Sequence, residues 1–430
     1  MIHYKTCFNL LCLQLSISLS LPSITSAAPA LQENDLIAIC GDSITEQRKY
    51  SVNMAAYFLM CQPESGLRSM QLGQGGENAS IFSKRLISEV LPFQPDVVTT
   101  CYGMNDGGYQ ALNDDRALRF RESTQKYIDE LRAAGVRRIV LGGPGAVDPQ
   151  TFSRSGRPTT AEIYNQTLSS LSDIAREIAA HNNLIFVDIH TPMLEVIHQA
   201  EAKYGPEYYV AGSDGIHASD NGQFIMSYAF LKALGCDGQI GTITYDAETD
   251  TATATSGHTI LSAQLGAIDL ESTRYPFCFA GDPSSPNSSI GMLEFIPFNQ
   301  ELNRYMLVVK HAPAQQMKVT WGEDSKVFSA AELAQGINLA DEFLNSPFYP
   351  AFRKVVTALH AQQGYESRTI RPHLKMLLDW EQGFPEAFNE KPELFAWQKT
   401  KIIERAAERV EATAQKVVPV QHRIVIESVE

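Results

Sequence analysis

The stretch Ile37–Thr45 reads IAICGDSIT, and it decides the fold of the first half of this 430-residue chain. Its apolar beginning is rich in β-branched residues, which predicts a buried strand that ends at Gly41. A helix is expected just beyond, so Ser43 would stand at the carboxyl edge of a parallel sheet, where open α/β folds place their sites. The amides and dipole of that helix would favour negative charge near Ser43. The stretch alone also allows a second interpretation, in which Asp42 and Ser43 only cap the helix.

From residue 35 to about 236, apolar strand candidates alternate with helical stretches. The strands are expected at 36–40, 69–72, 96–102, 138–141 and 184–189. The helices are expected near 49–60, 79–90, 114–134, 160–181 and 219–234. Short apolar strands that alternate with helices predict an α/β fold with a parallel sheet covered on both faces. The polar loop 145–158 is expected to run over the surface.

The sequence changes character after Gly235. Residues 239–325 are rich in Thr, Ser and Gly and alternate in hydropathy, which predicts antiparallel strands in a β layer or small sandwich. Residues 328–416 are helical in pattern, and the last helix has an apolar face at Ile403, Ala407, Val410, Ala414 and Val417. Residues 422–430 alternate again and could add a last strand. We therefore divide the chain into 33–237 and a β-rich region with C-terminal helices, 238–430.

The net charge and the first 28 residues limit the classes of function that are possible. The net charge of −14 argues against a nucleic acid or an anionic membrane as partner, whereas sulfated or uronic substrates stay possible. Residues 1–28 have one charged side chain, Lys5, an apolar core at 8–21 and small residues at their end. This layout predicts a secretory signal peptide, hence a secreted or periplasmic protein without stable membrane insertion. A retained interfacial anchor is the alternative.

Several patterns carry no chemistry of their own. The cysteines beyond the signal segment are an odd number without a CxxC pair, so neither a disulfide scaffold nor a zinc site is expected, and Cys40 and Cys101 are predicted to be buried. The histidines at 181, 190 and 198 are spaced too irregularly for a zinc motif, and the glycine run 73–76 lacks the spacing and lysine of a nucleotide site. No cofactor or metal is therefore expected. Trp321, Trp380 and Trp397 are expected to pack in the core, with a sugar-binding surface as the alternative.

Four short blocks at presumed strand ends together supply the parts of an acyl-transfer site. They are Gly41–Thr45, Gly73–Asn78, Gly103–Asp106 and Ser213–His217. His217 can take the proton of Ser43, and Asp214 can orient the imidazole from three residues away. Plausible oxyanion donors are the Ser43 amide, the Gly76 amide and the Asn105 carboxamide. Taken singly, each block could be only a turn or a helix cap.

In this order the blocks resemble those of the SGNH hydrolases, the GDSL esterase/lipase superfamily, whose four letters would be Ser43, Gly76, Asn105 and His217. The Gly-Asp-Ser-x-[ST], Gly-x-Asn-Asp and Asp-x-x-His motifs are intact. The glycine block departs from the usual Gly-[Asn/Asp]-Thr, since it reads Gly-Glu-Asn, and this leaves Gly75 as an alternative donor. The resemblance covers about residues 35–236. It implies a flavodoxin-like three-layer α/β/α domain with a five-stranded parallel sheet, and metal-free ester hydrolysis through a serine acyl-enzyme.

We therefore expect a secreted serine esterase with Ser43, His217 and Asp214 as catalytic residues and an oxyanion hole of Ser43, Gly76 and Asn105. The expected substrate is a carbohydrate O-acetyl ester, either a small molecule or a polysaccharide, because the chain looks exported and acidic and lacks a long apolar lid segment. The alternatives are a lipase, lysophospholipase or thioesterase of the same superfamily, and a catalytically idle carbohydrate-binding module.

Overall fold

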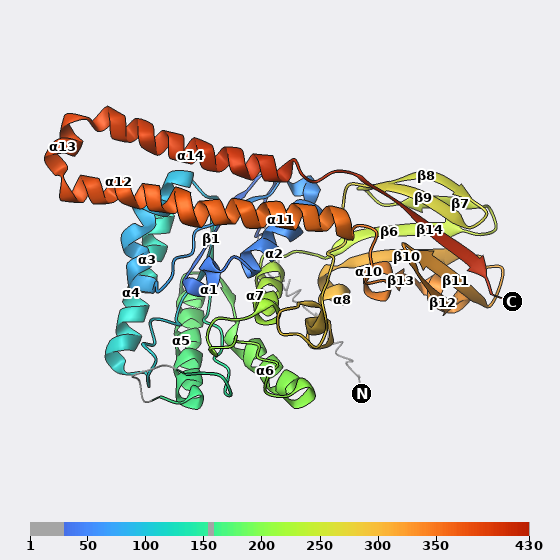
Figure 1. Ribbon diagram of the computed structural model, residues 1–430, viewed down its shortest axis with the longest axis horizontal. Coiled ribbons are helices and arrows are strands. Elements are labelled where there is room, and N and C mark those ends of the chain that lie inside the picture. The colour runs from blue at the N-terminus through green and yellow to red at the C-terminus, as the bar shows by residue number, and fades with distance from the viewer. Residues whose placement is uncertain (1–29, 154–158, 430) are drawn as a thin grey trace, which may run out of the picture.

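The computed structural model describes residues 30–153 and 159–429 (Figure 1). The expected signal peptide at 1–28 lies outside these residues. The described chain forms an α/β domain, a β-rich region beside it and a long helical hairpin that runs along the α/β domain. Within the described ranges, no helix is long and apolar enough to cross a membrane.

The α/β domain is built on a parallel five-stranded sheet, as predicted. Its strands are β1 (Leu36–Gly41), β2 (Arg68–Gln71), β3 (Val97–Cys101), β4 (Arg138–Gly142) and β5 (Ile185–Val187). Their order is β2-β1-β3-β4-β5, so β1 lies inside the sheet and β2 is an edge strand. The carboxyl ends of β1 and β3 are therefore neighbours, and these are the ends that lead into the first and third motif blocks.

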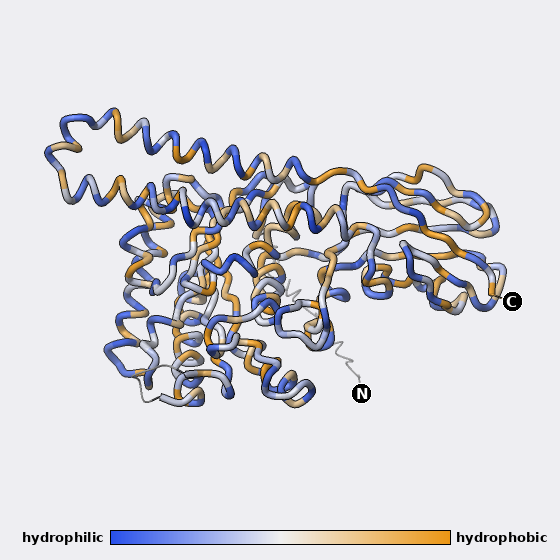
Figure 2. The backbone as a smooth tube through the Cα atoms, viewed as in Figure 1, coloured by the Kyte–Doolittle hydropathy of each residue, from blue (hydrophilic) through white to orange (hydrophobic). Residues whose placement is uncertain are grey.

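Helices cover both faces of this sheet. They are α2 (Tyr50–Ala56), α3 (Ala79–Arg85), α4 (Asp114–Ala133), α5 (Ala161–His181), α6 (His190–Tyr204) and α7 (Asp220–Ala233). Successive side chains of a strand point to opposite faces. Ile37 and Ile39 accordingly join the core with α2 and α7, whereas Ala38 and Cys40 join the core with α3 and α4. The central strands thus carry apolar residues on both faces, which explains their continuous hydrophobic sequence (Figure 2).

One expectation for this domain is wrong in part. The first residues of the loop 145–158 do not run over the surface, because Gly145–Asp148 are buried. Asn165 of α5 holds the backbone of Val147 with both its amide nitrogen and its oxygen, each at 2.9 Å. The Asp148 amide donates to the Gly215 carbonyl at 3.0 Å, which ties this loop to the last motif block. Residues 154–158 lie outside the described chain.

The β-rich region is a two-sheet sandwich. One sheet contains β13 (Ile337–Asn338), β10 (Arg304–Lys310), β6 (Gln239–Asp246) and β7 (Thr251–Ala254), in that order. The other contains β12 (Asp324–Ser329), β11 (Gln316–Trp321), β14 (Val420–Ser428), β9 (Ala267–Ser272) and β8 (His258–Gln264). The expected last strand is therefore confirmed as β14, in the middle of its sheet. The expectation of antiparallel pairing is wrong for β6 and β10, which pair in parallel because the 57 residues between them cross to the other sheet and return.

Short helices join these strands, and a long hairpin is inserted before β14. The short ones are α8 (Phe298–Leu302), α9 (Ala330–Gln335) and α10 (Leu339–Glu342). The hairpin consists of α11 (Tyr349–Tyr365), the π-helical segment η6 (Glu366–Ile370), α12 (Arg371–Gly383), α13 (Pro385–Glu390) and α14 (Pro392–Ala414). Figure 1 shows α11 and α12 in one line, with α14 returning beside them. The hairpin packs on α2 and on the edge strand β2 rather than on the sandwich.

The tryptophan prediction holds for one residue of three. Trp321 is fully buried in the sandwich, whereas Trp380 is 44% and Trp397 58% exposed near the end of the hairpin. The hairpin extends beyond the α/β domain there, so the core that would cover these rings is missing (Figure 1). On α14 the buried positions include Ala406 rather than Ala407. The described cysteines are free and buried, which confirms the prediction for Cys40 and Cys101.

Candidate active site

The first motif block turns sharply from β1 into a short helix, α1 (Ser43–Glu46). Asp42 caps this helix, because its Oδ1 accepts a hydrogen bond from the Ile44 amide at 2.9 Å. Burial raises the pKa of Asp42 to about 7, against the lowering effect of that hydrogen bond. The cap fixes Ser43 as the first residue of α1, where its amide has no acceptor within the helix. The capping interpretation of Asp42 is thus correct, and it is compatible with a reactive Ser43.

Ser43, His217 and Asp214 lie in one hydrogen-bonded line. Ser43 Oγ is 2.8 Å from His217 Nε2, and His217 Nδ1 is 2.6 Å from Asp214 Oδ2. Asp214 Oδ1 accepts the amides of Ile216 and His217 at 3.0 and 2.9 Å. Burial acts to raise the pKa of Asp214, but hydrogen bonds from the amide and ring of His217 outweigh it and hold this pKa below its ordinary value. The carboxylate is therefore ionised at neutral pH and selects the Nδ1–H tautomer of His217, which leaves Nε2 free to accept the proton of Ser43.

The glycine block contains two candidate donor amides, of which one is engaged by another described residue and one is not. The Gly75 amide is engaged, since it donates to Glu46 Oε2 at 2.8 Å. Gly76 has a left-handed φ of 72°, and a Cβ built on it would meet no atom within 4 Å. This exposed, uncrowded position leaves room for a ligand at the Gly76 amide. Of the two glycines left open by the sequence, Gly76 is the one without an engaged amide.

A buried ion pair explains why the glycine block departs from the family pattern. Glu77 is fully buried and accepts a hydrogen bond from Arg85 Nη2 at 2.6 Å, and the Tyr102 hydroxyl donates to the same oxygen at 2.6 Å. Asn78 takes the N-cap of α3, where its Oδ1 accepts from the Ile81 amide. The side chain after Gly76 is thus an anchor that fixes the block to the domain core.

Asn105 connects the glycine block to the third block. Its Nδ2 donates to the Glu77 carbonyl at 2.9 Å, and its Oδ1 accepts from the Tyr109 hydroxyl at 3.1 Å. The carboxamide nitrogen carries two hydrogens, so one N–H stays available beside this contact. The neighbouring Asp106 accepts the amides of Ala79 and Gly103, each at 3.0 Å. Burial raises the pKa of Asp106 to about 6 despite these hydrogen bonds.

The C-terminal half also reaches this site, which the sequence did not predict. Arg371 of α12 donates to Gln74 Oε1 at 2.7 Å and to Glu46 Oε1 at 3.0 Å. Glu46 in turn accepts the Gly75 amide. Arg371 therefore holds the glycine block directly through Gln74 and indirectly through Glu46. Glu46 follows the first motif directly, so its place on α1 was a usable signal. No local pattern marks Arg371, which is 325 residues further along the chain.

A polar cavity of about 690 Å³ opens in front of Ser43. Its lining contains Ser43, Glu46, Gln47, Arg48, Lys49, Tyr209, Ser213, Asp214, His217, Ser219 and Asn287. Apart from His217, Tyr209 is the one aromatic residue in this lining, and none of the described lining residues is aliphatic. Asn287 comes from the loop after β9, so the β-rich region contributes to the wall.

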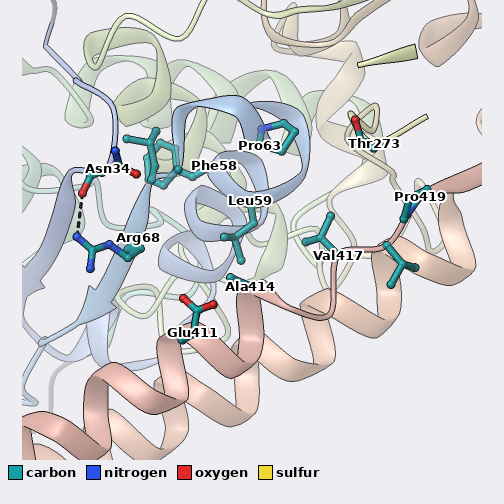
Figure 3. A pocket seen from close by; sticks show the side chains of 13 residues that line it. Asn34, Phe58, Leu59, Pro63, Arg68, Thr273, Glu411, Ala414, Val417 and Pro419 are labelled. Carbon is teal, nitrogen blue, oxygen red and sulfur yellow. Dashed lines mark hydrogen bonds between the residues drawn. The ribbon is translucent and has the colours of Figure 1, made fainter. Parts of the chain in front are cut away.

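A second cavity, of about 720 Å³, lies between the end of α14 and the segment around Phe58 (Figure 3). Arg68 at its edge donates to the Asn34 carbonyl. Its described lining, which includes Leu59, Pro63 and Val417, contains no histidine, so it offers no paired nucleophile and base.

The fold and the site define an α/β hydrolase-like domain with a serine and a histidine in hydrogen-bond contact. Residues 39–224 match the model of the GDSL-like Lipase/Acylhydrolase family. An acetylxylan esterase from Geobacillus stearothermophilus is 26% identical over 179 residues, which are 40% of this chain and 74% of that enzyme. These matches support the assignment of the α/β domain to the SGNH hydrolase superfamily, and with it a hydrolase that acts on esters.

Comparison with solved structures extends the likeness beyond this domain. A gut microbial diltiazem-metabolizing enzyme superposes on 93% of this chain and 98% of its own, with 22% sequence identity and a TM-score of 0.70. A structure of the acetylxylan esterase Axe2 from Geobacillus stearothermophilus covers 48% of this chain and 96% of its own, with 20% identity and a TM-score of 0.40. The first comparison indicates that the sandwich and the hairpin belong to a fold found in another protein.

Proposed function

We propose that this protein is a serine esterase that removes acetyl groups from carbohydrates through an acyl-enzyme. The observation that carries the proposal is the line Ser43–His217–Asp214, with contacts of 2.8 and 2.6 Å. In the first step His217 Nε2 takes the proton of Ser43 as Oγ attacks the ester carbonyl carbon. The imidazolium that forms is stabilised by the ionised Asp214.

The tetrahedral intermediate carries a negative charge on the former carbonyl oxygen. We assign its stabilisation to the amides of Ser43 and Gly76 and the second N–H of Asn105. His217 then gives its proton to the alcohol oxygen, and the sugar hydroxyl leaves. In the second half-reaction His217 takes a proton from water, the resulting hydroxide attacks the acyl-serine, and acetate leaves as Ser43 recovers its proton.

The cavity lining supports a short acyl group. Its described residues are polar or charged apart from Tyr209, so a long alkyl chain would find little apolar surface to bury. A lipase, lysophospholipase or thioesterase needs such a surface. The similarity to an acetylxylan esterase points in the same direction. Export through residues 1–28, and a polysaccharide as the natural substrate, remain part of this proposal.

The test is hydrolysis of p-nitrophenyl esters of increasing chain length, together with acetate release from acetylated xylan. We expect the acetyl ester to be preferred and Ser43→Ala to lower kcat on the order of 10⁴-fold or more. Ser213→Ala, which removes a second hydroxyl from the same cavity, is the matched control and should keep most of the activity. A preference for long chains would contradict the acetyl-ester proposal. Absence of both turnover and fluorophosphonate labelling at Ser43 would indicate an idle domain.

A further inference from the structure

Two arginines lie side by side near Gly364, and one of them, Arg48, lines the cavity of Ser43, whereas the other, Arg368, is exposed beside it. Arg48 lines the cavity, and Arg368 lies on η6 of the hairpin. A Cβ added to Gly364 would be 3.2 Å from Arg48 Nη1 and 2.8 Å from Arg368 Nη2, so both guanidinium groups occupy the space beside this glycine. Neither makes a side-chain hydrogen bond or ion pair with any residue of 30–153 or 159–429. They come from opposite halves of the chain.

The carboxylates near these arginines are already engaged. Lys49 is 2.9 Å from Asp220, and Arg371 is 3.0 Å from Glu46. Asp214 is held by His217. The local pairs therefore balance each other, and the charges of Arg48 and Arg368 are left over. Two neighbouring positive charges repel each other. The chain has a net charge of −14, so it has more carboxylates than cations, and its composition does not force two arginines to stay unpaired.

The backbone is in an unfavourable conformation at Arg48, and the residue type is unfavourable at Gly364. Arg48 ends the segment after α1 with a left-handed φ of 60°, a conformation that usually requires glycine or asparagine. Gly364 lies within α11, where glycine is less favourable than alanine by about 1 kcal/mol. Both costs are explained if the two guanidinium groups must meet at this point. Strain next to a nucleophile is a common mark of a functional site.

The geometry points to an anion subsite, formed by Arg48 and Arg368, that binds a carboxylate or sulfate group on the sugar part of the ester. Guanidinium groups bind such planar or tetrahedral oxyanions with paired N–H donors. Because Arg48 and Ser43 line one cavity, an anion bound there would belong to the molecule whose ester is cleaved. The inference rests on the proposed esterase function and narrows its substrate class to acetyl esters of acidic glycans.

The experiment compares acetylated polygalacturonate with the same polymer after methyl esterification of its carboxylates. For each protein the ratio of kcat/KM for the anionic and neutral polymers is measured, because this ratio cancels any general effect on the nucleophile. We expect wild type to prefer the anionic polymer by about tenfold or more at low salt, and the preference to fall as salt is added. An acetylated sulfated galactan, beside its desulfated form, separates sulfate from carboxylate binding.

Arg48→Gln and Arg368→Gln should each lower this ratio several-fold, and Arg48→Lys should keep part of it. Arg353→Gln is the matched control, since it removes an exposed arginine from the same helix as Gly364, at a site that does not line the cavity. Thermal unfolding verifies that each variant is folded.

If p-nitrophenyl acetate is cleaved in a Ser43-dependent manner but the wild-type ratio is near one, or is equal in all variants, the subsite proposal is wrong and the esterase proposal stands. If p-nitrophenyl acetate is not cleaved and Ser43 is not labelled, the esterase proposal fails first. Inhibition by inorganic sulfate alone, without a preference among polymers, also overturns the subsite.

Discussion

The two sides of the candidate site are held over very different sequence distances. On the side of His217, Asp214 lies three residues away and takes both the ring and two backbone amides. On the side of Gly76, the loop is held by Glu46 and, through it, by Arg371 from the distant hairpin. The first arrangement is a local turn within the α/β domain. In the second arrangement the contacts of Arg371 exist only when the hairpin is docked, so the hairpin supports this side of the site.

The largest effect is expected from a substitution in the local turn, at Asp214. In Asp214→Asn the new amide nitrogen faces His217 Nδ1 and favours the tautomer with the proton on Nε2, which cannot accept the proton of Ser43. We expect kcat for p-nitrophenyl acetate to fall on the order of 10³- to 10⁴-fold, while the fold is retained. Steady-state kinetics and a thermal unfolding curve test this.

Asp282→Asn is the matched control for this change. Asp282 also accepts the amide of a residue two positions later, in an exposed loop of the β-rich region. Its replacement should leave kcat within about twofold of wild type, in line with the small effects of most surface substitutions. If Asp214→Asn retained more than a tenth of the activity, Asp214 would be a turn residue rather than part of a triad.

The same contrast explains what the sequence could predict. The proximity of Ser43, Asp214 and His217 could be predicted because each lies in a short motif, and because parallel strands bring their carboxyl ends to one edge. The five strands were found because β1, β3 and β4 are apolar on both faces. The choice between Gly75 and Gly76 depends on a side chain, Glu46, whose direction no local pattern specifies.

Long-range pairings account for the remaining differences. The parallel pairing of β6 with β10 depends on where the intervening chain crosses, which alternating hydropathy does not encode. The burial of Gly145–Asp148 depends on Asn165, which satisfies the backbone of that loop. Trp380 lies on a helix whose pattern is that of a packed helix, but the hairpin extends past the domain that would cover it. In each case the outcome depends on whether another part of the chain packs at that position.

A moderate effect is expected from removing the long-range contact between Arg371 and Glu46. Arg371→Gln removes the cation beside Glu46, so the Gly73–Gly76 loop loses its support from the hairpin. Oxyanion donors act mainly in the transition state, so kcat should fall about tenfold with little change in KM for p-nitrophenyl acetate. Arg371→Lys, which keeps the charge, should recover part of the loss.

Lys375→Gln is the control on the same helix, because Lys375 pairs with Asp379 on an exposed face. The rate of labelling by a fluorophosphonate gives a second readout, since it depends on the same oxyanion donors but on no bound substrate. Unchanged kcat and labelling in Arg371→Gln would mean that the hairpin only shields the edge of the sheet.

The smallest effect is expected at β2, the edge strand of the parallel sheet. The backbone of β2 has no neighbouring strand on one side, and the end of α11 and the start of η6 supply the missing partners. Glu366 accepts the Gln71 amide at 2.8 Å, and Gln362 donates to the Ser69 carbonyl at 3.2 Å. Burial raises the pKa of Glu366 from its ordinary value of 4.5 to about 7, against the lowering effect of the Gln71 amide. Since the unfolded chain releases this proton near pH 4.5, the folded protein retains a proton that the unfolded chain has lost. The contribution of Glu366 to stability is therefore present below pH 4.5 and is lost as the pH rises to about 7.

Glu366→Gln removes this titration, so the pH dependence of stability is the quantity to measure rather than stability itself. Gln has one acceptor oxygen where Glu366 uses two, so the absolute free energy of unfolding will also change. The slope of that free energy between pH 4.5 and 7 should become less negative by at most about 1.4 kcal/mol per pH unit, the effect of one proton. Asp42 and Asp106, whose pKa values are also raised, titrate equally in both proteins and cancel. Urea unfolding at several pH values in this window tests the prediction. Parallel curves for wild type and variant would mean that Glu366 is ionised at the edge of β2, and that the hairpin is docked there by an ionised carboxylate.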